Sequence, residues 1–350
     1  MAVPEIVIAG REIGPAHPPF VIAELSANHN GSLDVAFQIM EAAKGAGAHA
    51  IKLQTYKADT VTIDHDGPGF SIEGGLWGGN TLYRLYEEAH TPWEWQPALF
   101  ERGRELGLIV FSSPLDFSAV DFLEELDAPA YKIASFELID LPLVRKCAAT
   151  GKPLIISTGM ANLAEIGETV DAAMVAGATQ IALLHCTSGY PTPPEEADLR
   201  TIPHLADAFG LVTGLSDHTP GSGVPIAAVA LGAAIIEKHV TLRRSDGGPD
   251  AAFSLEPEEL RVVCEGVAMA HKALGGVRYR RSDAEVGNTQ FRRSLYIVED
   301  MRKGDILTAS TLRSIRPGFG LAPKHYDMLL GKRVNRDVSR GTPMSWNLIG

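Results

Sequence analysis

The sequence predicts a (β/α)8 TIM barrel of the α/β class, followed by a small, mostly β C-terminal domain. Three observations support this fold class. Eight short apolar runs alternate with amphipathic segments over about 270 residues, which fits the length and period of such a barrel. Polar residues stand at the end of every run. Near residue 280 the composition changes to a basic stretch that is poor in aliphatic residues.

The eight runs are expected to be strands, because near-continuous apolar stretches of this length are typical of parallel strands buried on both faces. The first run reads FVIAE and the last reads AIIEK. In chain order, the expected strands cover residues 20–24, 50–54, 108–112, 130–133, 153–157, 181–185, 211–215 and 234–238.

Between the strands, apolar residues recur at helical spacing, so we expect helices there. Most of these segments end in a Gly-Ala or similar break, which favours a helix end. A doubly wound open sheet is the alternative architecture. It is disfavoured because no glycine-rich dinucleotide-binding turn follows the first strand. The clearest expected helices cover residues 33–46, 97–105, 119–126 and 163–176.

Two segments depart from the alternation. Residues 56–90 form an insert that is too long for an ordinary strand-to-helix loop, and its six glycines with Trp77 and Tyr83 indicate a binding element or a lid. Residues 219–236 form the longest uncharged run. Because this run contains Pro225 and many small residues, we interpret it as a loop, a buried helix and a buried strand, not as a membrane span.

The change in composition sets the domain boundaries. We assign residues 1–280 to the barrel, 281–293 to a linker and 294–350 to the C-terminal domain. A module of about 60 residues is too small to be very stable alone, so we expect it to dock on another surface.

The overall composition limits the possible partners. The 350 residues are 45% apolar and 21% charged, which excludes disorder as the main state. The net charge of −12 argues against a nucleic-acid-binding or anionic-membrane-binding surface, so an anionic substrate must be held by a few focused cations. Three widely spaced cysteines give neither a disulfide framework nor a zinc motif, and the N-terminus lacks the basic start of a signal peptide. A cytoplasmic location is therefore expected.

The carboxyl ends of barrel strands meet at one face, so polar residues there are the candidate functional groups. Lys52 and Lys132 lie inside apolar runs, where an unpaired ammonium group is costly. They are expected to bind an anionic ligand, although a structural pair with Glu24 or Glu137 would also satisfy them. Serines at the strand ends would complete a pocket for phosphate and carboxylate groups: Ser112, Ser135, Ser157 and Ser216.

His218 and His239 end two strands that are neighbours in a closed barrel. Two converging imidazoles suit a divalent transition metal, with water and substrate oxygens in the open positions. Asp217 and Asp250 are candidates to accept substrate hydroxyls, although the Gly-Gly-Pro segment 247–249 also fits a plain turn.

Eight motifs occur in a fixed order: IAELSANHNGS, IKLQTY, YKIAS, ISTGM, LHCTSGYPTP, GLSDHT, EKHVT and GGPDAAFSL. Together they resemble the sialic acid synthase family, and the resemblance covers residues 17–350. The stretch SLYIVEDMRKGDILTASTLRSIRPGFG resembles the antifreeze-like (SAF) domain that follows the barrel in that family. The start of the first motif, the insert and Ser188 in CTSGYP, where sialic acid synthases typically have Asn, favour the pseudaminic acid synthase branch.

The resemblance implies a transferase that condenses phosphoenolpyruvate with the open-chain form of an N-acetylated amino sugar and releases phosphate by C–O bond cleavage. In this branch the sugar is 2,4-diacetamido-2,4,6-trideoxy-L-altrose and the product is pseudaminic acid. A sialic or legionaminic acid synthase is the alternative within the family. A metal-dependent aldolase, another phosphoenolpyruvate-condensing barrel and a non-catalytic sugar- or ice-binding protein are the alternatives from other classes.

The resemblance also implies roles for single residues. The implied catalytic residues are Glu24, as an acid/base group, Lys52 and Lys132. His218 and His239 match ligands of a divalent metal, usually Mn²⁺, with Mg²⁺ or Co²⁺ possible. The phosphoenolpyruvate contacts are matched by the two lysines with Ser112, Ser135, Ser157 and Ser216, and the sugar contacts by Gln54, Glu137, Tyr190 and Asp250.

Arg316 matches an arginine that the SAF domain of this family inserts into the barrel of the partner subunit, where it contacts the N-acetyl group of the sugar. This match implies a domain-swapped homodimer with two composite active sites.

Overall fold

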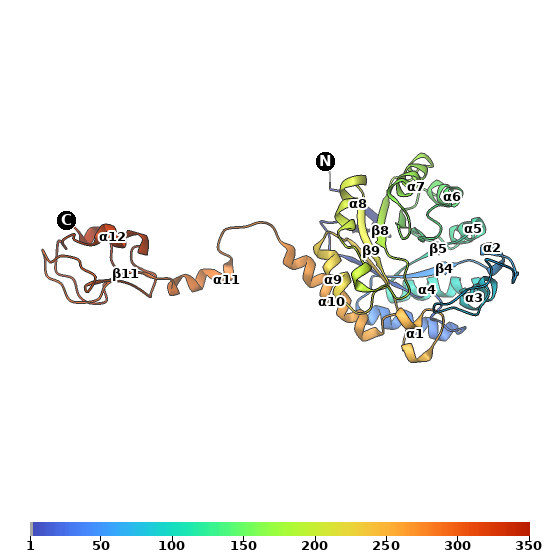
Figure 1. Ribbon diagram of the computed structural model, residues 1–350, viewed down its shortest axis with the longest axis horizontal. Coiled ribbons are helices and arrows are strands. Elements are labelled where there is room, and N and C mark those ends of the chain that lie inside the picture. Colours follow the sequence, from blue (N-terminus) through green and yellow to red (C-terminus); the bar gives the residue numbers. More distant parts are fainter. Residues whose placement is uncertain (1–2) are drawn as a thin grey trace. The chain divides into compact units, whose positions relative to one another are not determined.

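The computed structural model describes residues 3–350, which divide into two compact units, one ending at Gly275 and the other beginning at Gly276 (Figure 1). The first unit is a closed barrel of parallel strands in the order β10-β3-β4-β5-β6-β7-β8-β9, which confirms the predicted fold class. Each strand begins within one residue of its expected position and ends within two. The barrel strands are β3 (Phe20–Glu24), β4 (Ala50–Thr55), β5 (Ile109–Pro114), β6 (Tyr131–Ile133), β7 (Leu154–Ser157), β8 (Ile181–Cys186), β9 (Val212–Asp217) and β10 (Ile235–His239).

Helices surround the barrel (Figure 1). The four clearest sequence expectations correspond to α1, α4, α5 and α7, and the buried helix and strand expected in the uncharged run are α9 and β10. The longer helices are α1 (Leu33–Ala46), α4 (Gln96–Leu106), α5 (Phe117–Glu125), α6 (Leu141–Ala149), α7 (Leu163–Val175), α8 (Thr201–Phe209), α9 (Gly223–Ala230) and α10 (Pro257–Leu274). The insert holds α2 (Ala58–Val61) and α3 (Leu82–Ala89), and short 3-10 turns cover Trp93–Trp95, Pro194–Glu196, Arg244–Asp246 and Ala251–Phe253.

Local sequence signals set the bounds of α1. Ser32 precedes the helix with extended backbone, and its side chain accepts a hydrogen bond from the Val35 amide at 3.4 Å. At the other end, Gly47 adopts φ +99, a left-handed conformation that glycine accepts without steric cost. These two caps explain why the predicted range of this helix, 33–46, agrees with the structure.

The inside of the barrel has two layers, because side chains alternate between its inside and outside along each strand. The lower layer is apolar, and the hairpin of β1 (Ile6–Ile8) and β2 (Arg11–Ile13) packs against it. Its residues on the strands, or directly before β6 in the case of Ala130, include Ile22, Ala50, Phe111, Ala130, Ile155, Leu184 and Ile235. Two residues further along the same strands, the positions are polar or ionisable: Glu24, Lys52, Ser113, Lys132, Ser157, Cys186 and Glu237. The apolar layer thus forms a floor beneath a chemically active layer.

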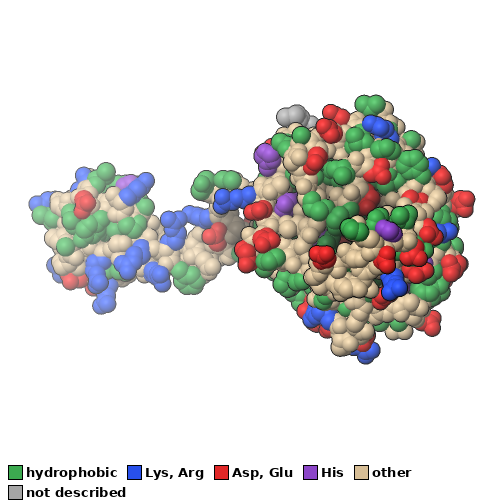
Figure 2. Space-filling model, turned by 45° about the vertical axis from the view of Figure 1, so that its right-hand side comes forward, with side chains coloured by type: hydrophobic (Ala, Val, Ile, Leu, Met, Phe, Trp, Pro, Cys, Tyr) green, Lys and Arg blue, Asp and Glu red, His purple; other side chains and the backbone are tan. Residues whose placement is uncertain are grey.

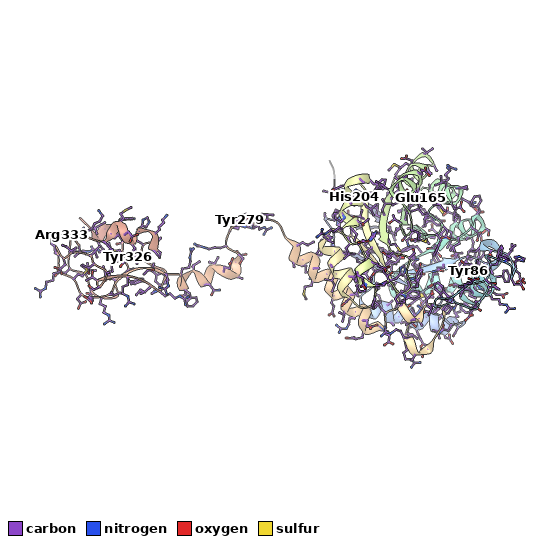
Figure 3. The ribbon with its side chains drawn as sticks, viewed as in Figure 1. Tyr86, Glu165, His204, Tyr279, Tyr326 and Arg333 are labelled. Atoms are coloured by element: carbon purple, nitrogen blue, oxygen red, sulfur yellow. The ribbon has the colours of Figure 1, made fainter. Side chains whose placement is uncertain are left out.

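The second unit has a separate apolar core that includes Leu295, Leu312 and Leu329. Its strands β11 (Ser294–Ile297) and β12 (Leu312–Ile315) pair antiparallel. Tyr279, near the start of the unit, is fully exposed (Figure 3). The short helices are α11 (Asp283–Val286) and α12 (Tyr326–Leu329), with 3-10 turns at Gly287–Phe291, Pro323–His325 and Trp346–Leu348. Across the described residues, none of the helices combines the length and the hydropathy that a bilayer span requires.

Candidate active site

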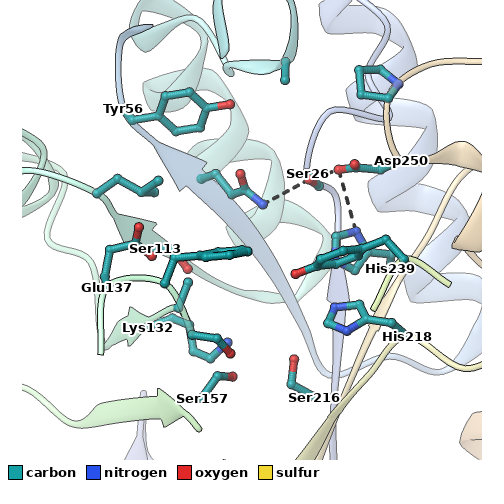
Figure 4. A pocket seen from close by; sticks show the side chains of 18 of the residues that line it. Ser26, Tyr56, Ser113, Lys132, Glu137, Ser157, Ser216, His218, His239 and Asp250 are labelled. Carbon is teal, nitrogen blue, oxygen red and sulfur yellow. Dashed lines mark hydrogen bonds and ion pairs between the residues drawn. The ribbon is translucent and has the colours of Figure 1, made fainter. Parts of the chain in front are cut away.

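A cavity of about 370 Å³ opens at the carboxyl ends of the barrel strands (Figure 4). It is lined by residues of the barrel unit, both from the strand ends and from the insert. Eleven of the residues singled out in the sequence line it: Lys52, Gln54, Lys132, Ser135, Glu137, Ser157, Tyr190, Ser216, His218, His239 and Asp250. Side chains separated by up to about 200 positions in the sequence therefore meet in one pocket.

The two buried lysines share carboxylates. The Lys52 ammonium group lies 2.7 Å from Glu24 Oε2 and 3.5 Å from Glu237 Oε1. Lys132 Nζ donates a hydrogen bond to the same Glu237 oxygen at 3.0 Å, and Ser216 Oγ donates to it at 3.2 Å. Lys52 thus makes the pair with Glu24 that the sequence analysis left as the alternative to ligand binding, whereas Lys132 pairs with Glu237 and not with Glu137. Glu237 therefore holds both ammonium groups at the floor of the pocket.

The electrostatic environment gives the carboxyl groups of Glu237 and Glu24 different pKa values. Burial alone would raise the pKa of Glu237, but the ammonium groups of Lys132 and Lys52 lower it to about 2. Burial raises the pKa of Glu24 to about 7, against the opposing effect of Lys52. Glu237 therefore presents a carboxylate that stays ionised in the pocket lining. Glu24 is fully buried and is not itself a lining residue, but its carboxyl group, in contact with Lys52, can exchange a proton near neutral pH.

Ser112 is a correction to the predicted phosphate pocket. Its hydroxyl lies 2.6 Å from Thr55 Oγ1, outside the cavity, while Ser113 lines the cavity and accepts a hydrogen bond from Lys52 at 3.3 Å. The physical reason is the alternation along β5: Phe111 belongs to the inner floor, so Ser113 faces inward and Ser112 faces outward.

Asp217 is corrected in the same way. It lies outside the main cavity and binds the buried ammonium group of Lys238, 2.9 Å away. Its neighbours on β9 and at the end of that strand, Ser216 and His218, do line the cavity. Asp217 and Lys238 therefore form an ion pair on the outer side of two adjacent strands, β9 and β10.

The imidazole rings of His218 and His239 lie next to each other, with their centroids 5.3 Å apart and their planes tilted by 55° (Figure 4). His218 Nδ1 is 3.1 Å from the carbonyl oxygen of Thr187, which leaves its Nε2 free for another partner. His239 Nδ1 is buried without a hydrogen-bond partner among the described residues, and Asp250 Oδ2 lies 3.9 Å from it. Two buried imidazoles with an unused nitrogen and a nearby carboxylate fit a divalent transition metal.

A polar chain connects this histidine pair to β4. Gln54 Nε2 donates hydrogen bonds to Glu24 Oε1 at 3.1 Å and to Ser26 Oγ at 3.0 Å. Ser26 in turn donates to Asp250 (Figure 4). This chain offers amide and carboxylate groups along one side of the cavity, where a polyhydroxylated ligand finds hydrogen-bond partners.

The lining residues that were not assigned a role from the sequence include three whose side chains can bind polar ligand groups: Ser26, Ser113 and Glu237. A signal for Glu237 was present, because His239 was expected to face the pocket and the residue two positions earlier on a strand faces the same side. The insert was expected to be a binding element or a lid. It contributes Tyr56, Trp77 and α3 to the pocket lining, and Trp77 Nε1 donates a hydrogen bond to the Pro249 carbonyl at 2.8 Å.

Arg316 lies in the second unit, directly after β12, and its side chain is exposed. It is therefore available to a partner surface, but it is not part of the cavity in the barrel unit.

Comparison with known proteins places these observations in a family. A model of the NeuB family matches residues 39–279, and a model of the SAF domain matches residues 292–349. A pseudaminic acid synthase of Campylobacter jejuni is 44% identical over 92% of this chain and 94% of its own length. The pseudaminic acid synthase of Helicobacter pylori is 41% identical over 94% of this chain and 97% of its own.

The crystal structure of the spore coat polysaccharide biosynthesis protein spsE from Bacillus subtilis is similar across both units, with a TM-score of 0.67, 32% identity and 99% of each chain covered. The family model spans more than half of the present chain, and the relatives align with over nine-tenths of it. The resemblance noted from the sequence is thus confirmed, and the chain is an enzyme of the NeuB family that ends in a SAF domain.

Proposed function

We propose that this enzyme condenses phosphoenolpyruvate with the open-chain form of 2,4-diacetamido-2,4,6-trideoxy-L-altrose, giving pseudaminic acid and phosphate. The observation that carries the proposal is the buried Lys52–Glu237–Lys132 cluster beside two adjacent imidazoles in a single cavity. The pseudaminic acid synthases among the relatives support the choice of sugar. A sialic or legionaminic acid synthase is the alternative, with the same reaction and another amino sugar.

The cation arrangement suits a ligand that carries both a phosphate and a carboxylate. Lys52 and Lys132 are 4% and 2% exposed, so their charges are little screened by water. Ser157 Oγ is buried without a hydrogen-bond partner among the described residues, and Ser135 and Ser216 also line the cavity. Free hydroxyl and ammonium donors at the floor would bind the anionic groups of phosphoenolpyruvate.

The reaction joins C3 of phosphoenolpyruvate to the aldehyde carbon of the sugar, and the aldehyde oxygen gains a proton. Water then adds to C2, and the bond between C2 and the bridging oxygen breaks to release phosphate. We assign the proton transfers with this water to the carboxyl group of Glu24, because its pKa of about 7 allows it to take and return a proton at neutral pH. Lys52, in contact with Glu24, would orient both this carboxyl group and the phosphoenolpyruvate.

His218 and His239 would hold a divalent ion, Mn²⁺ by preference and Mg²⁺ or Co²⁺ as substitutes. When bound, such an ion supplies Lewis-acid polarisation of the aldehyde oxygen. The residues around it would position the sugar. Asp250 and Gln54 offer hydrogen-bond partners for its hydroxyl and amide groups. The ring centroid of Tyr190 lies 4.6 Å from that of His218.

The first prediction tests the reaction. Purified enzyme with Mn²⁺ should release phosphate from phosphoenolpyruvate only when a suitable amino sugar is also present, and the mass of the product should equal that of the sugar plus pyruvate. A panel of amino sugars then shows whether the enzyme acts as a pseudaminic, legionaminic or sialic acid synthase. Aldol chemistry with free pyruvate, or binding of sugar without any turnover, would contradict the proposal and favour an aldolase or a binding protein.

We also propose a domain-swapped homodimer in which Arg316 completes the active site of the partner. The second unit is small and basic, with 14 Lys and Arg against 7 Asp and Glu, while residues 1–275 hold 17 against 36 (Figure 2). Opposite charge on the two units favours their association between chains. Loops after β6 and β7 also expose Phe136, Ile139 and Met160 at the barrel mouth, to 59%, 67% and 64%. An exposed apolar rim of this kind suits a docked partner.

The second prediction tests this assembly. Arg316→Ala should lower kcat/KM for the sugar by about 10- to 100-fold, the range expected for one charge-assisted contact, while the barrel stays folded. Arg313→Ala, at an exposed position on β12 three residues before Arg316, serves as the matched control. Because a composite site takes its barrel from one chain and its arginine from the other, mixing Arg316→Ala with Glu24→Ala chains should restore part of the activity. Mixtures no more active than either variant alone would exclude the composite site.

A further inference from the structure

Helix α3 of the insert presents an apolar stripe to the cavity. Leu82, Leu85, Tyr86 and Ala89 follow the i, i+3, i+4, i+7 spacing of one helix face, and all four line the cavity (Figure 3 labels Tyr86). The positions on the opposite face, including Glu87 and Glu88, are exposed.

This stripe is not used for core packing. Within residues 3–350, neither of the apolar clusters of the barrel unit includes a residue of α3. The apolar face of an amphipathic helix normally packs against such a cluster. Here it forms one wall of a cavity that is also lined by the charged groups of Lys52, Lys132 and Glu237. Leu115 and Phe136 from neighbouring loops also line the cavity.

The wall is held in place by hydrogen bonds from backbone amides and by an aromatic contact. Thr81 accepts a hydrogen bond from the Arg84 amide at 3.3 Å at the start of α3, and the Leu82 amide donates to the Phe70 carbonyl at 2.8 Å. Tyr86 packs edge-on against Tyr56, the residue that follows β4, with ring centroids 5.7 Å apart. A wall anchored in this way can discriminate between ligands by shape and polarity.

The wall distinguishes a methyl group from a hydroxyl. A methyl group gains free energy when it leaves water for an apolar surface, whereas a hydroxyl placed there loses its hydrogen bonds to water and finds no partner. Glu137 also lines the cavity and has a buried oxygen without a hydrogen-bond partner among the described residues, so the wall rejects a hydroxyl where the hydroxyl meets Leu82, Leu85 and Ala89 and not this carboxyl group. The polar groups that bind sugar hydroxyls, Gln54 and Asp250, lie on the other side, next to the histidine pair.

We propose that the α3 stripe is a specificity wall that receives the methyl-bearing end of a 6-deoxy amino sugar and rejects the same sugar with a terminal hydroxymethyl group. A sugar whose aldehyde carbon lies at the two imidazoles, and whose chain crosses the cavity, ends at this wall. The inference rests on the proposed function, since it identifies the part of the proposed sugar that contacts the insert.

The experiment compares two sugars that differ only at C6: 2,4-diacetamido-2,4,6-trideoxy-L-altrose and its counterpart with a C6 hydroxyl group, 2,4-diacetamido-2,4-dideoxy-L-altrose. The wild-type enzyme should prefer the methyl-bearing sugar in kcat/KM by about 10- to 100-fold, the range that an apolar pocket achieves against one added hydroxyl. Leu82→Asn places a hydrogen-bonding group on the wall and should reduce this ratio by about tenfold, mainly through a lower KM for the hydroxylated sugar. Ala89→Ser is a second, smaller change that a helix tolerates, and Glu88→Gln on the exposed face is the matched control.

The outcomes separate this inference from the proposed function. If phosphate is released but the ratio is the same in the wild type and both wall variants, the wall does not read C6 and the inference is wrong. If neither sugar supports phosphate release, the proposed function is contradicted. The affinities of the two sugars, measured by calorimetry, then test separately whether the α3 stripe distinguishes them. An affinity for the methyl-bearing sugar at least about tenfold higher than for the hydroxylated sugar supports the inference, and equal affinities overturn it.

Discussion

Glu237→Gln should lower the free energy of unfolding by about 3–5 kcal/mol and remove measurable release of phosphate from phosphoenolpyruvate, because it leaves a buried ammonium group without its carboxylate. Glu237 is the partner of Lys132 at 3.0 Å and the second partner of Lys52 at 3.5 Å. With a neutral amide in its place, Lys132 has no other carboxylate within ion-pair distance among the described residues. Chemical denaturation gives the loss of stability, and a phosphate assay gives the loss of activity.

A double variant separates stability from chemistry. Glu237→Gln combined with Lys132→Met removes the unpaired ammonium group, so it should recover most of the lost free energy of unfolding but none of the activity. The pKa of Glu237 in the folded protein, about 2, lies below its ordinary value of 4.5. Its stabilising effect is therefore present above about pH 4.5 and is lost as the pH falls toward 2, so the stability gap between wild type and Glu237→Gln should narrow in acid. A single variant as stable and active as the wild type would rule out this role for Glu237.

His218→Ala should reduce phosphate release by about a thousandfold and abolish tight binding of Mn²⁺. The reduction follows from the loss of Lewis-acid assistance, which contributes several kcal/mol to the rate. Binding of Mn²⁺ can be measured directly by electron paramagnetic resonance, so this test does not depend on activity. His204→Ala is the matched control, since His204 is an exposed histidine on α8. Full activity of His218→Ala in metal-stripped buffer, or undiminished Mn²⁺ binding, would disprove the assignment of the metal site.

Much of the fold follows from local properties of the chain. The apolar runs locate each strand to within two residues, and Ser32 with Gly47 marks both ends of α1. The errors concern which face of a strand a side chain occupies. β5 extends to Pro114, two residues beyond its expected end, and within it Ser113, not Ser112, faces the cavity. Alternation along a strand can be read only once one inward residue is known, and here that residue is Phe111.

The candidate site was predictable where a residue type has few other reasons to be buried. Lys52 and Lys132 were selected on this ground and the two histidines because they end neighbouring strands, and all four line the cavity. Glu237 was not assigned a role although its strand was recognised, because its role is to neutralise two lysines that lie on other strands. Its contact with Lys132 joins residues 105 positions apart, and no local pattern reports such a contact.

By itself, the sequence determined the barrel, the approximate positions of its strands and the residue types available for phosphate, metal and sugar chemistry, because hydrophobic periodicity and side-chain chemistry are properties of short segments. Only the tertiary structure decided that Glu237 joins the two lysines, that Ser113 takes the place of Ser112, and that the apolar stripe of α3 faces the cavity instead of the core. The physical reason is that barrel closure and the packing of the insert bring together side chains that are remote along the chain, and these contacts set the charge and polarity at every point of the pocket.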